Sequence, residues 1–206
     1  MNKIFYYYNK AYDWFVDKNL NIETSKCIKL DEHDNIMNFM YEPSSYLQIK
    51  SVFKKYPLCR DDHLIDFGCG KGRVLVMASE YGCRNLYGID ISSYLLEIAR
   101  VNLNQCKQTD VVFELLCMNA KYYDFNQKIN KIFFYNPFQL KVFIHIFKSL
   151  LHSIDDNPRM VTVYFNGAQK STIEYFEKMG RFQLIGKEEK KGVYIYTHIP
   201  CNAKLD

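Results

Sequence analysis

Apolar residues along this chain fall into two alternating patterns from about residue 58 onward. Short runs of consecutive apolar residues are typical of buried strands, whereas apolar residues that recur every three or four positions are typical of helices. The strand pattern occupies residues 63–67, 85–89, 111–117, 129–135, 159–165, 181–187 and 192–198. The helical pattern occupies residues 71–81, 92–106, 140–152 and 168–178.

This alternation predicts an α/β fold with a mostly parallel sheet. Parallel strands need long crossover connections, and right-handed helical crossovers place helices on the faces of the sheet. The last two strands are joined without a helix, so residues 182–185 and 193–196 are expected to form a closing antiparallel pair. The chain length suits one such domain with a small extension.

The first 57 residues lie outside the alternation. They are rich in aromatic residues and carry helical patches at residues 4–16 and 44–55. Pro57 disfavours helix at the residue before it, which marks a boundary. We therefore expect a helical, aromatic-rich N-terminal extension or lid over residues 1–57 and the α/β domain over residues 58–206.

Composition and charge narrow the function classes. Apolar residues make up 48% of the chain, so a buried core is available, and the formal net charge is only +4. The densest basic run, Lys187–Lys191, is diluted by two glutamates and is expected to be a solvated hairpin. We therefore do not expect nucleic acid as a partner. No run is long enough to span a membrane and the N-terminus lacks a signal-peptide pattern, so we expect a soluble cytoplasmic protein.

The seven cysteines are odd in number and scattered, and no pair has C-x-x-C spacing. The five histidines cluster with none of them in sequence. The sequence therefore predicts neither a metal site nor a disulfide framework, which fits a reducing compartment.

The most informative segment is the decapeptide LIDFGCGKGR, residues 64–73, in which a predicted strand runs through alternating glycines into a helix. Glycines allow positive φ and close approach of a ligand, and the helix N-terminus offers free N–H groups to a nucleotide-like ligand. The dinucleotide-binding pattern G-x-G-x-x-G would need glycine where Arg73 stands, so that ligand class is excluded.

An acid follows at the end of the next predicted strand. Asp90 lies about twenty residues past the glycines, where a carboxylate can accept hydrogen bonds from both ribose hydroxyls. The alternative is that Asp90 is the N-cap of the helix that begins near Ser92 and Ser93.

The pattern D-x-G-x-G-x-G, from Asp66 to Gly72, resembles motif I of class I S-adenosylmethionine-dependent methyltransferases. The resemblance covers about residues 61–199. It implies a Rossmann-like three-layer sandwich with a mostly parallel seven-stranded sheet whose last strand is antiparallel, and S-adenosyl-L-methionine as cofactor, with S-adenosyl-L-homocysteine as product. The cofactor-binding residues that it implies are Asp66, Gly68, Cys69, Gly70, Gly72, Asp90, Ile91, Asn119, Ala120 and Asn136.

The resemblance places the adenine near the end of the third strand. The family usually has an acid followed by alanine there, and this chain has Asn119 followed by Ala120. The side-chain oxygen of Asn119 can still accept a hydrogen bond, although Asp124 is a rival for the same contact. The alternative is that Asn119 only caps the turn into residues 121–124.

The fourth strand ends in Asn136-Pro137-Phe138, which resembles the N/D-P-P-Y/F motif of methyltransferases that modify amino groups. The resemblance implies that Asn136 orients the acceptor and that Phe138 stacks on it, which makes these two residues the predicted catalytic pair. This chain has one proline instead of two, so its loop geometry is expected to differ from that of the motif. The alternative is a plain strand-end turn with Phe138 in the core.

The extension offers two further candidates. In many such enzymes the segment before motif I closes over the cofactor, and here Tyr41 and Tyr46 lie in that segment. The alternative is that they are packing residues, because tyrosine is abundant in this chain.

The resemblance thus implies a methyltransferase whose acceptor is an unidentified small molecule or protein side chain. Methyl transfer from an activated sulfonium depends mainly on alignment, so no acid–base pair is required. A methyltransferase that acts on RNA or protein amino groups is one alternative. A non-catalytic S-adenosylmethionine-binding module is the other.

Overall fold

Seven strands form one sheet at the centre of the structure. The computed structural model describes residues 3–29, 40–135 and 138–200. The strands are β3 (His63–Phe67), β4 (Asn85–Asp90), β5 (Val112–Cys117), β6 (Lys131–Tyr135), β7 (Val161–Asn166), β8 (Gln183–Glu188) and β9 (Val193–His198). Their order across the sheet is β5-β4-β3-β6-β7-β9-β8.

The sheet is parallel from β5 to β7. Strand β9 is inserted antiparallel between β7 and β8, with an irregularity between Leu184 and Gly186. The predicted mostly parallel sheet with an antiparallel last strand is confirmed. This order puts the carboxyl ends of β3, β4, β5 and β6 along one edge, where the predicted site residues follow each strand.

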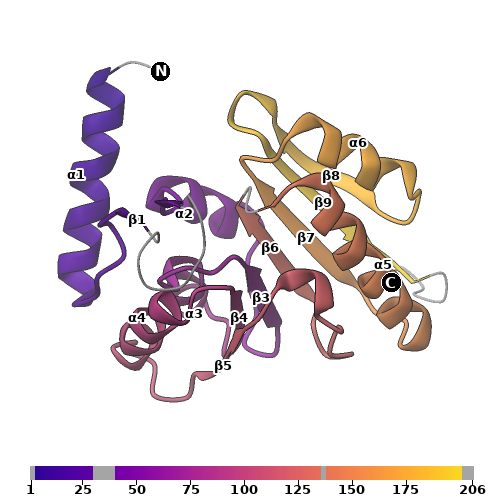
Figure 1. Ribbon diagram of the computed structural model, residues 1–206, viewed down its shortest axis with the longest axis horizontal. Helices are drawn as coiled ribbons and strands as arrows, with labels where there is room; N and C mark the ends of the chain where they lie inside the picture. The colour runs from indigo at the N-terminus through magenta and orange to yellow at the C-terminus, as the bar shows by residue number, and fades with distance from the viewer. Residues whose placement is uncertain (1–2, 30–39, 136–137, 201–206) are drawn as a thin grey trace.

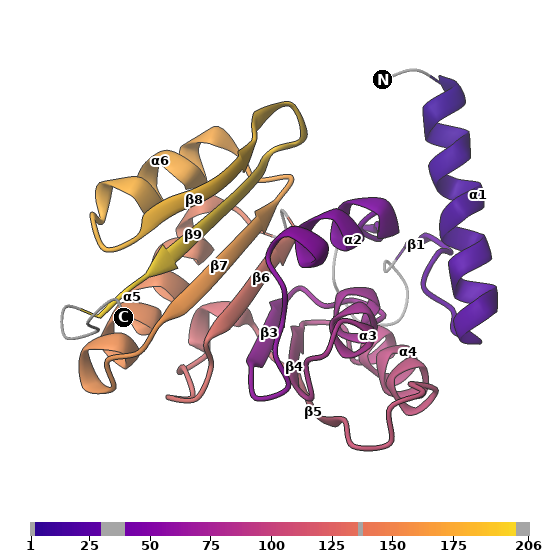
Figure 2. The same ribbon diagram turned by 180° about the vertical axis from the view of Figure 1, so that it is seen from behind.

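Helices cover both faces of the sheet, as Figures 1 and 2 show from opposite sides. One face carries α2, α3 and α4, and the other carries α5, α6 and the short 3₁₀ helix η1. The predicted three-layer sandwich is confirmed. The helices are α1 (Lys3–Leu20), α2 (Tyr46–Lys55), α3 (Arg73–Glu80), α4 (Ser93–Asn104), α5 (Leu140–Asp156) and α6 (Lys170–Lys178), with η1 (Ala120–Tyr122) and η2 (Glu189–Lys191).

Alternate residues of each strand supply two separate cores. In β7, Tyr164 joins the cluster under α2 and α3, whereas Val163 and Phe165 join the cluster under α5 and α6. Both clusters are rich in aromatic rings, among them Phe53 of α2, which packs edge-on against Tyr164 at 6.0 Å between ring centroids. Since side chains alternate between faces along a strand, each sheet residue can be assigned to one face.

Helix α1 lies at one end of the molecule, beside α2 (Figure 1). It runs four residues beyond the predicted end and stops where Asn21 adopts a φ of +55°, a conformation that asparagine tolerates at helix C-termini. Its inward face buries Asp13 and Asp17, and its outward face exposes Trp14 and Phe15. No helix among the described residues is long and apolar enough to cross a membrane.

A small two-stranded sheet in the extension was not predicted. It pairs β1 (Ile28–Lys29) with β2 (Met40–Tyr41) in antiparallel register. The pair is short, but it sets the position of Tyr41 at the start of the chain segment that leads into α2.

Candidate functional site

The glycine turn joins β3 to α3 at the carboxyl edge of the sheet. Gly68, Gly70 and Gly72 have φ values of +78°, +52° and +78°, a region that other residues enter only at a cost. The amides of Gly68 and Cys69 donate to the carbonyl oxygen of Ile89 in β4, at 2.8 and 3.0 Å. The turn is therefore fixed to the neighbouring strand.

Asp90 joins the turn to the next helix. One carboxylate oxygen accepts the Gly70 amide at 2.8 Å and the other accepts the Ser92 amide at 3.0 Å. Ser92, not Asp90, caps α4, because its hydroxyl accepts the Leu95 amide. The N-cap alternative for Asp90 is thus wrong. Each carboxylate oxygen can accept more than one hydrogen bond, which is the capacity that a contact with ribose hydroxyls requires.

Asp66 lies one strand away from Asp90 and is almost fully buried. Burial, and to a lesser degree the neighbouring charge of Asp90, raises the pKa of Asp66 well above the ordinary carboxyl range. Burial also raises the pKa of the Cys69 thiol well above its usual range, so this thiol is not an activated nucleophile. The amides of Gly68, Cys69 and Gly70 donate to Ile89 and Asp90 of β4, and not to Asp66, the penultimate residue of β3.

The predicted adenine neighbours lie along the ends of β4 and β5. Ile91 is 49% exposed although it is apolar, and it directly follows Asp90. Asn119 accepts the Lys121 amide at 3.1 Å as the N-cap of η1, which confirms its capping role. Ala120 is buried beside it, whereas the rival Asp124 is exposed and accepts the Ser149 hydroxyl at 3.4 Å.

The structure describes only part of the segment that follows β6. Asn136 lies outside the described residues. Phe138 is half-buried and packs edge-on against Phe143 of α5, at 5.7 Å between ring centroids. This contact agrees with the packing alternative for Phe138, since its ring borders the core under α5.

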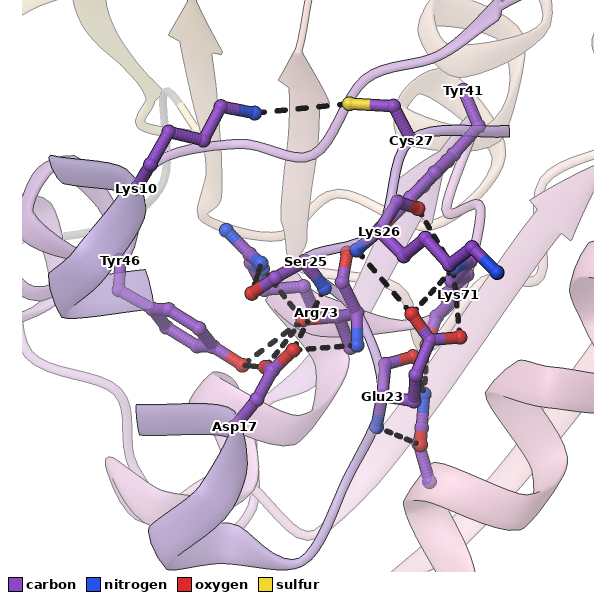
Figure 3. Close-up of polar contacts among 12 residues, drawn as sticks. Lys10, Asp17, Glu23, Ser25, Lys26, Cys27, Tyr41, Tyr46, Lys71 and Arg73 are labelled. Atoms are coloured by element: carbon purple, nitrogen blue, oxygen red, sulfur yellow. Dashed lines mark hydrogen bonds and ion pairs between the residues drawn. The ribbon is translucent and has the colours of Figure 1, made fainter. Parts of the chain in front are cut away.

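Lys71 inside the turn and Arg73 directly after it bind the N-terminal extension (Figure 3). Lys71 donates to both carboxylate oxygens of Glu23, at 2.7 and 2.8 Å, and to the Lys26 carbonyl at 2.8 Å. The Lys71 side chain is fully buried, and burial lowers its pKa. Asn102 of α4 holds the same segment, because its amide bonds both main-chain polar groups of Glu23 and the Lys71 carbonyl.

Arg73 makes the second attachment and is 2% exposed. Its guanidinium pairs with Asp13 of α1 at 2.7 Å and donates to the Ser44 carbonyl at 2.6 Å. The same group bonds the hydroxyls of Thr24 and Ser25, at 2.7 and 2.8 Å. Loss of one partner from a buried ion pair of this kind is strongly destabilising.

The two tyrosines of the extension differ in position. Tyr41 lies on the glycine turn, because a Cβ added to Gly70 would be 2.7 Å from its Cδ2 and closer still to its Cε2. Its hydroxyl donates to the Thr24 carbonyl at 2.9 Å. Tyr46 lies farther from the turn, fully buried beneath Arg73, and donates to Asp17 at 2.6 Å.

The sequence did not reveal Glu23, Lys71, Arg73 or Asp13 as parts of this edge. The sequence did contain one hint of these contacts. A lysine lies within the glycine turn and an arginine directly follows it, and neither residue is needed to form the turn. Their partners lie 48 and 60 residues upstream, so no local pattern pointed to them.

The arrangement suits a nucleoside-bearing ligand. An exposed apolar residue, Ile91, adjoins an acid that can accept vicinal hydroxyls, and a glycine turn lies on the other side of that acid. Within residues 3–29, 40–135 and 138–200, no group of three or more histidine, cysteine, aspartate or glutamate side chains is arranged to hold a metal.

Comparison with known proteins agrees with this geometry. A family profile described as a methyltransferase domain matches residues 64–163, which include the turn, strands β4 to β6, most of β3 and the first half of β7. No curated protein sequence matches the chain.

Solved structures similar to this chain share its fold. A ribosomal protein L11 methylase from Lactobacillus delbrueckii subsp. bulgaricus is 16% identical, with 75% of this chain and 77% of that chain covered and a TM-score of 0.57. An RNA methyltransferase from Salinibacter ruber in complex with S-adenosyl-L-homocysteine is 19% identical, with 80% and 97% covered and a TM-score of 0.56. Magnesium protoporphyrin IX methyltransferase from Synechocystis PCC 6803 with bound SAM is 12% identical, with 75% and 76% covered and a TM-score of 0.52.

Proposed function

We propose that this chain, of which residues 64–163 match a methyltransferase-domain profile, is a class I S-adenosylmethionine-dependent methyltransferase that transfers the methyl group of that cofactor to a small molecule or a protein side chain. The observation that carries the proposal is the positive-φ glycine turn with its central amide held by the acid at the end of the neighbouring strand. An acid between a glycine turn and an exposed apolar residue is the arrangement that a nucleoside requires.

The cofactor residues are assigned along this edge. Asp90 accepts the ribose hydroxyls, and Ile91 together with the Asn119–Ala120 turn borders the adenine. The buried acid Asp66 stays under the loop, near the methionine end. The full assignment is Asp66, Gly68, Cys69, Gly70, Gly72, Asp90, Ile91, Asn119, Ala120 and Asn136, the last of which lies outside the described residues.

The bound cofactor supplies a methyl group on a sulfonium that is already activated, so the chain must mainly align an acceptor and exclude water. We assign acceptor orientation to Asn136 and an acceptor contact to Phe138, because β6 lies next to β3 and ends at the same edge as the glycine turn. The half-buried position of Phe138 leaves part of its ring available.

We also propose that residues 1–57 act as a lid on the cofactor. The support is that Tyr41 packs on Gly70 and that Glu23, Asp13 and Thr24 bind the turn residues Lys71 and Arg73. Tyr46 belongs to the lid as an anchor beneath Arg73, because it is too deeply buried to reach a ligand.

A labelling experiment tests the function. The protein is incubated with S-adenosylmethionine tritiated on its methyl group and with cell extract, which is then separated into protein, RNA and small-molecule fractions. Gly70→Leu serves as the matched control, because its side chain would collide with the Tyr41 ring and distort the turn that the cofactor is proposed to contact. We expect label in the small-molecule or protein fraction with the unaltered protein only.

The other outcomes separate the alternatives. Label in the RNA fraction would favour the RNA-directed alternative. If the protein binds S-adenosyl-L-homocysteine in calorimetry but labels no fraction, the proposed transfer is wrong and a cofactor-binding module remains.

A further inference from the structure

Asn166 is a buried amide whose hydrogen bonds are missing. It is the last residue of β7 and is 1% exposed. Neither its amide nitrogen nor its amide oxygen has a partner, and among the described residues no other side chain has two buried polar atoms left in this state. Buried polar groups in proteins are nearly always paired, so a doubly unpaired amide calls for an explanation.

Asn102 shows what the same side chain does in a structural role. It is equally buried, at 2% exposure, and it makes three hydrogen bonds, with the Glu23 amide, the Glu23 carbonyl and the Lys71 carbonyl. Burial without such bonds opposes folding, because the amide loses its hydration and gains nothing in return. Asn166 therefore does not serve the stability of the fold as Asn102 does.

The position of Asn166 relates it to the acceptor side of the proposed site. It pairs in register with Tyr135, the last residue of β6. Tyr135 and Asn166 each follow by two positions a residue that packs against Phe53 of α2, so both side chains project onto the α2 face. The segment after Tyr135 carries the predicted acceptor motif.

Tyr135 is the more accessible member of this pair. Its side chain is half-buried whereas Asn166 is 1% exposed, so an acceptor can reach the amide only if neighbouring side chains move. The glycine turn follows β3, which is the other neighbour of β6. Asn166 in β7 therefore lies on the side of β6 away from the glycine turn, where an acceptor and not the cofactor is expected.

We propose that Asn166 binds the methyl acceptor through both ends of its amide, with Tyr135 beside it. This inference rests on the proposed transfer function. An amide offers a donor and an acceptor in one plane, so its complement is a planar group with an acceptor next to a donor. A carboxamide of a protein side chain and the edge of a nitrogen heterocycle both have this chemistry, and the labelled fraction distinguishes the two sources.

The first test needs no acceptor. Asn166→Val replaces the unpaired amide with a strand-forming residue, and Asn102→Leu removes the paired amide as the matched control. We expect the melting temperature of Asn166→Val to stay unchanged or to rise by about 2–4 °C, whereas that of Asn102→Leu falls. A fall in Asn166→Val as large as that of the control would mean that Asn166 is structural and would overturn the proposal.

The second test uses the extract fraction that the unaltered protein labels. Asn166→Val should bind S-adenosyl-L-homocysteine with unchanged affinity but transfer methyl groups at least about 10-fold more slowly, as expected when an orienting hydrogen bond is lost. Transfer at the unaltered rate, or a parallel loss of cofactor affinity, would overturn the acceptor assignment. If the unaltered protein labels no fraction, the proposed function itself fails and this inference fails with it.

Discussion

The contact between Tyr41 and the glycine turn leads to a quantitative prediction for Gly70→Ala. Gly70 has a φ of +52°, and a non-glycine residue in this region loses about 1–2 kcal/mol. The added Cβ would also lie 2.7 Å from Tyr41 Cδ2, so the ring must move. Because Tyr41 is 9% exposed and donates to the Thr24 carbonyl, movement breaks a hydrogen bond worth about 0.5–1.5 kcal/mol.

The two contributions add to a loss of about 1.5–3.5 kcal/mol in the free energy of unfolding for Gly70→Ala. Gly180→Ala is the matched control. Gly180 has a φ of +64°, but nothing lies within 4 Å of an added Cβ. This variant should lose only the conformational part, about 1–2 kcal/mol. Urea unfolding of both variants measures the difference.

A third variant separates the effect of the Tyr41 ring on stability from the conformational effect at Gly70. In a Tyr41→Ala background there is no ring to displace, so the further change Gly70→Ala should destabilise the protein only as much as Gly180→Ala does. This is a double-mutant cycle, and the excess measured with Tyr41 present is the coupling between the ring and the turn. If Gly70→Ala has the same effect with and without the ring, Tyr41 does not rest on the turn and its place in the lid is refuted.

Further predictions concern the carboxylates and the acceptor motif. Asp90→Ala should weaken binding of S-adenosyl-L-homocysteine by about 10–150-fold, because a charge-assisted hydrogen bond contributes about 1.5–3 kcal/mol; unchanged affinity in calorimetry would refute a ribose contact. Burial raises the pKa of Asp66, so its contribution to stability is complete at low pH and is lost as the pH rises through the folded-state value. As the pH rises above the ordinary carboxyl pKa, the melting temperature of Asp66→Asn should therefore fall less steeply than that of the unaltered protein. An identical pH dependence in the two proteins would contradict this assignment. Asn136→Ala should keep cofactor affinity while slowing transfer by more than about 10-fold, and Phe138→Ala should mainly raise KM for the acceptor; full activity in both variants would leave the segment a plain turn.

The sheet was predictable because its signals are local. The apolar run at residues 63–67 and the acid at Asp90 specify where β3 and β4 end, and β3 agrees with its prediction residue for residue. The glycines were equally informative, because positive φ is a requirement of single positions. The N-cap of α4 was predicted less well, since Asp90 and Ser92 are both residue types that suit an N-cap. Only the fold shows that Ser92 accepts the Leu95 amide and that Asp90 accepts the Gly70 amide.

The contacts of the extension were not predictable, because they join residues distant in sequence. Arg73 is an ordinary first residue of a helix by pattern, and Asp13 is an ordinary polar residue of an aromatic helix. Only the fold brings them to 2.7 Å in a buried ion pair. Asn166 likewise reads as a polar strand end, and its unpaired amide is a property of its surroundings alone.

The glycine turn therefore has two kinds of position with different duties. Its glycines provide the conformation and the close approach that a ligand needs, and the lysine and arginine between and after them point away to bind the extension. Since Lys71 is fully buried by segment 22–26 and Arg73 by α1 and Ser44, displacement of the extension would leave two cations without their partners. Such a loss is severe for a buried pair, so the extension and the turn are expected to order together. Cofactor binding and attachment of the extension then share the turn at residues 68–73, which is why a variant of the extension is expected to alter cofactor affinity.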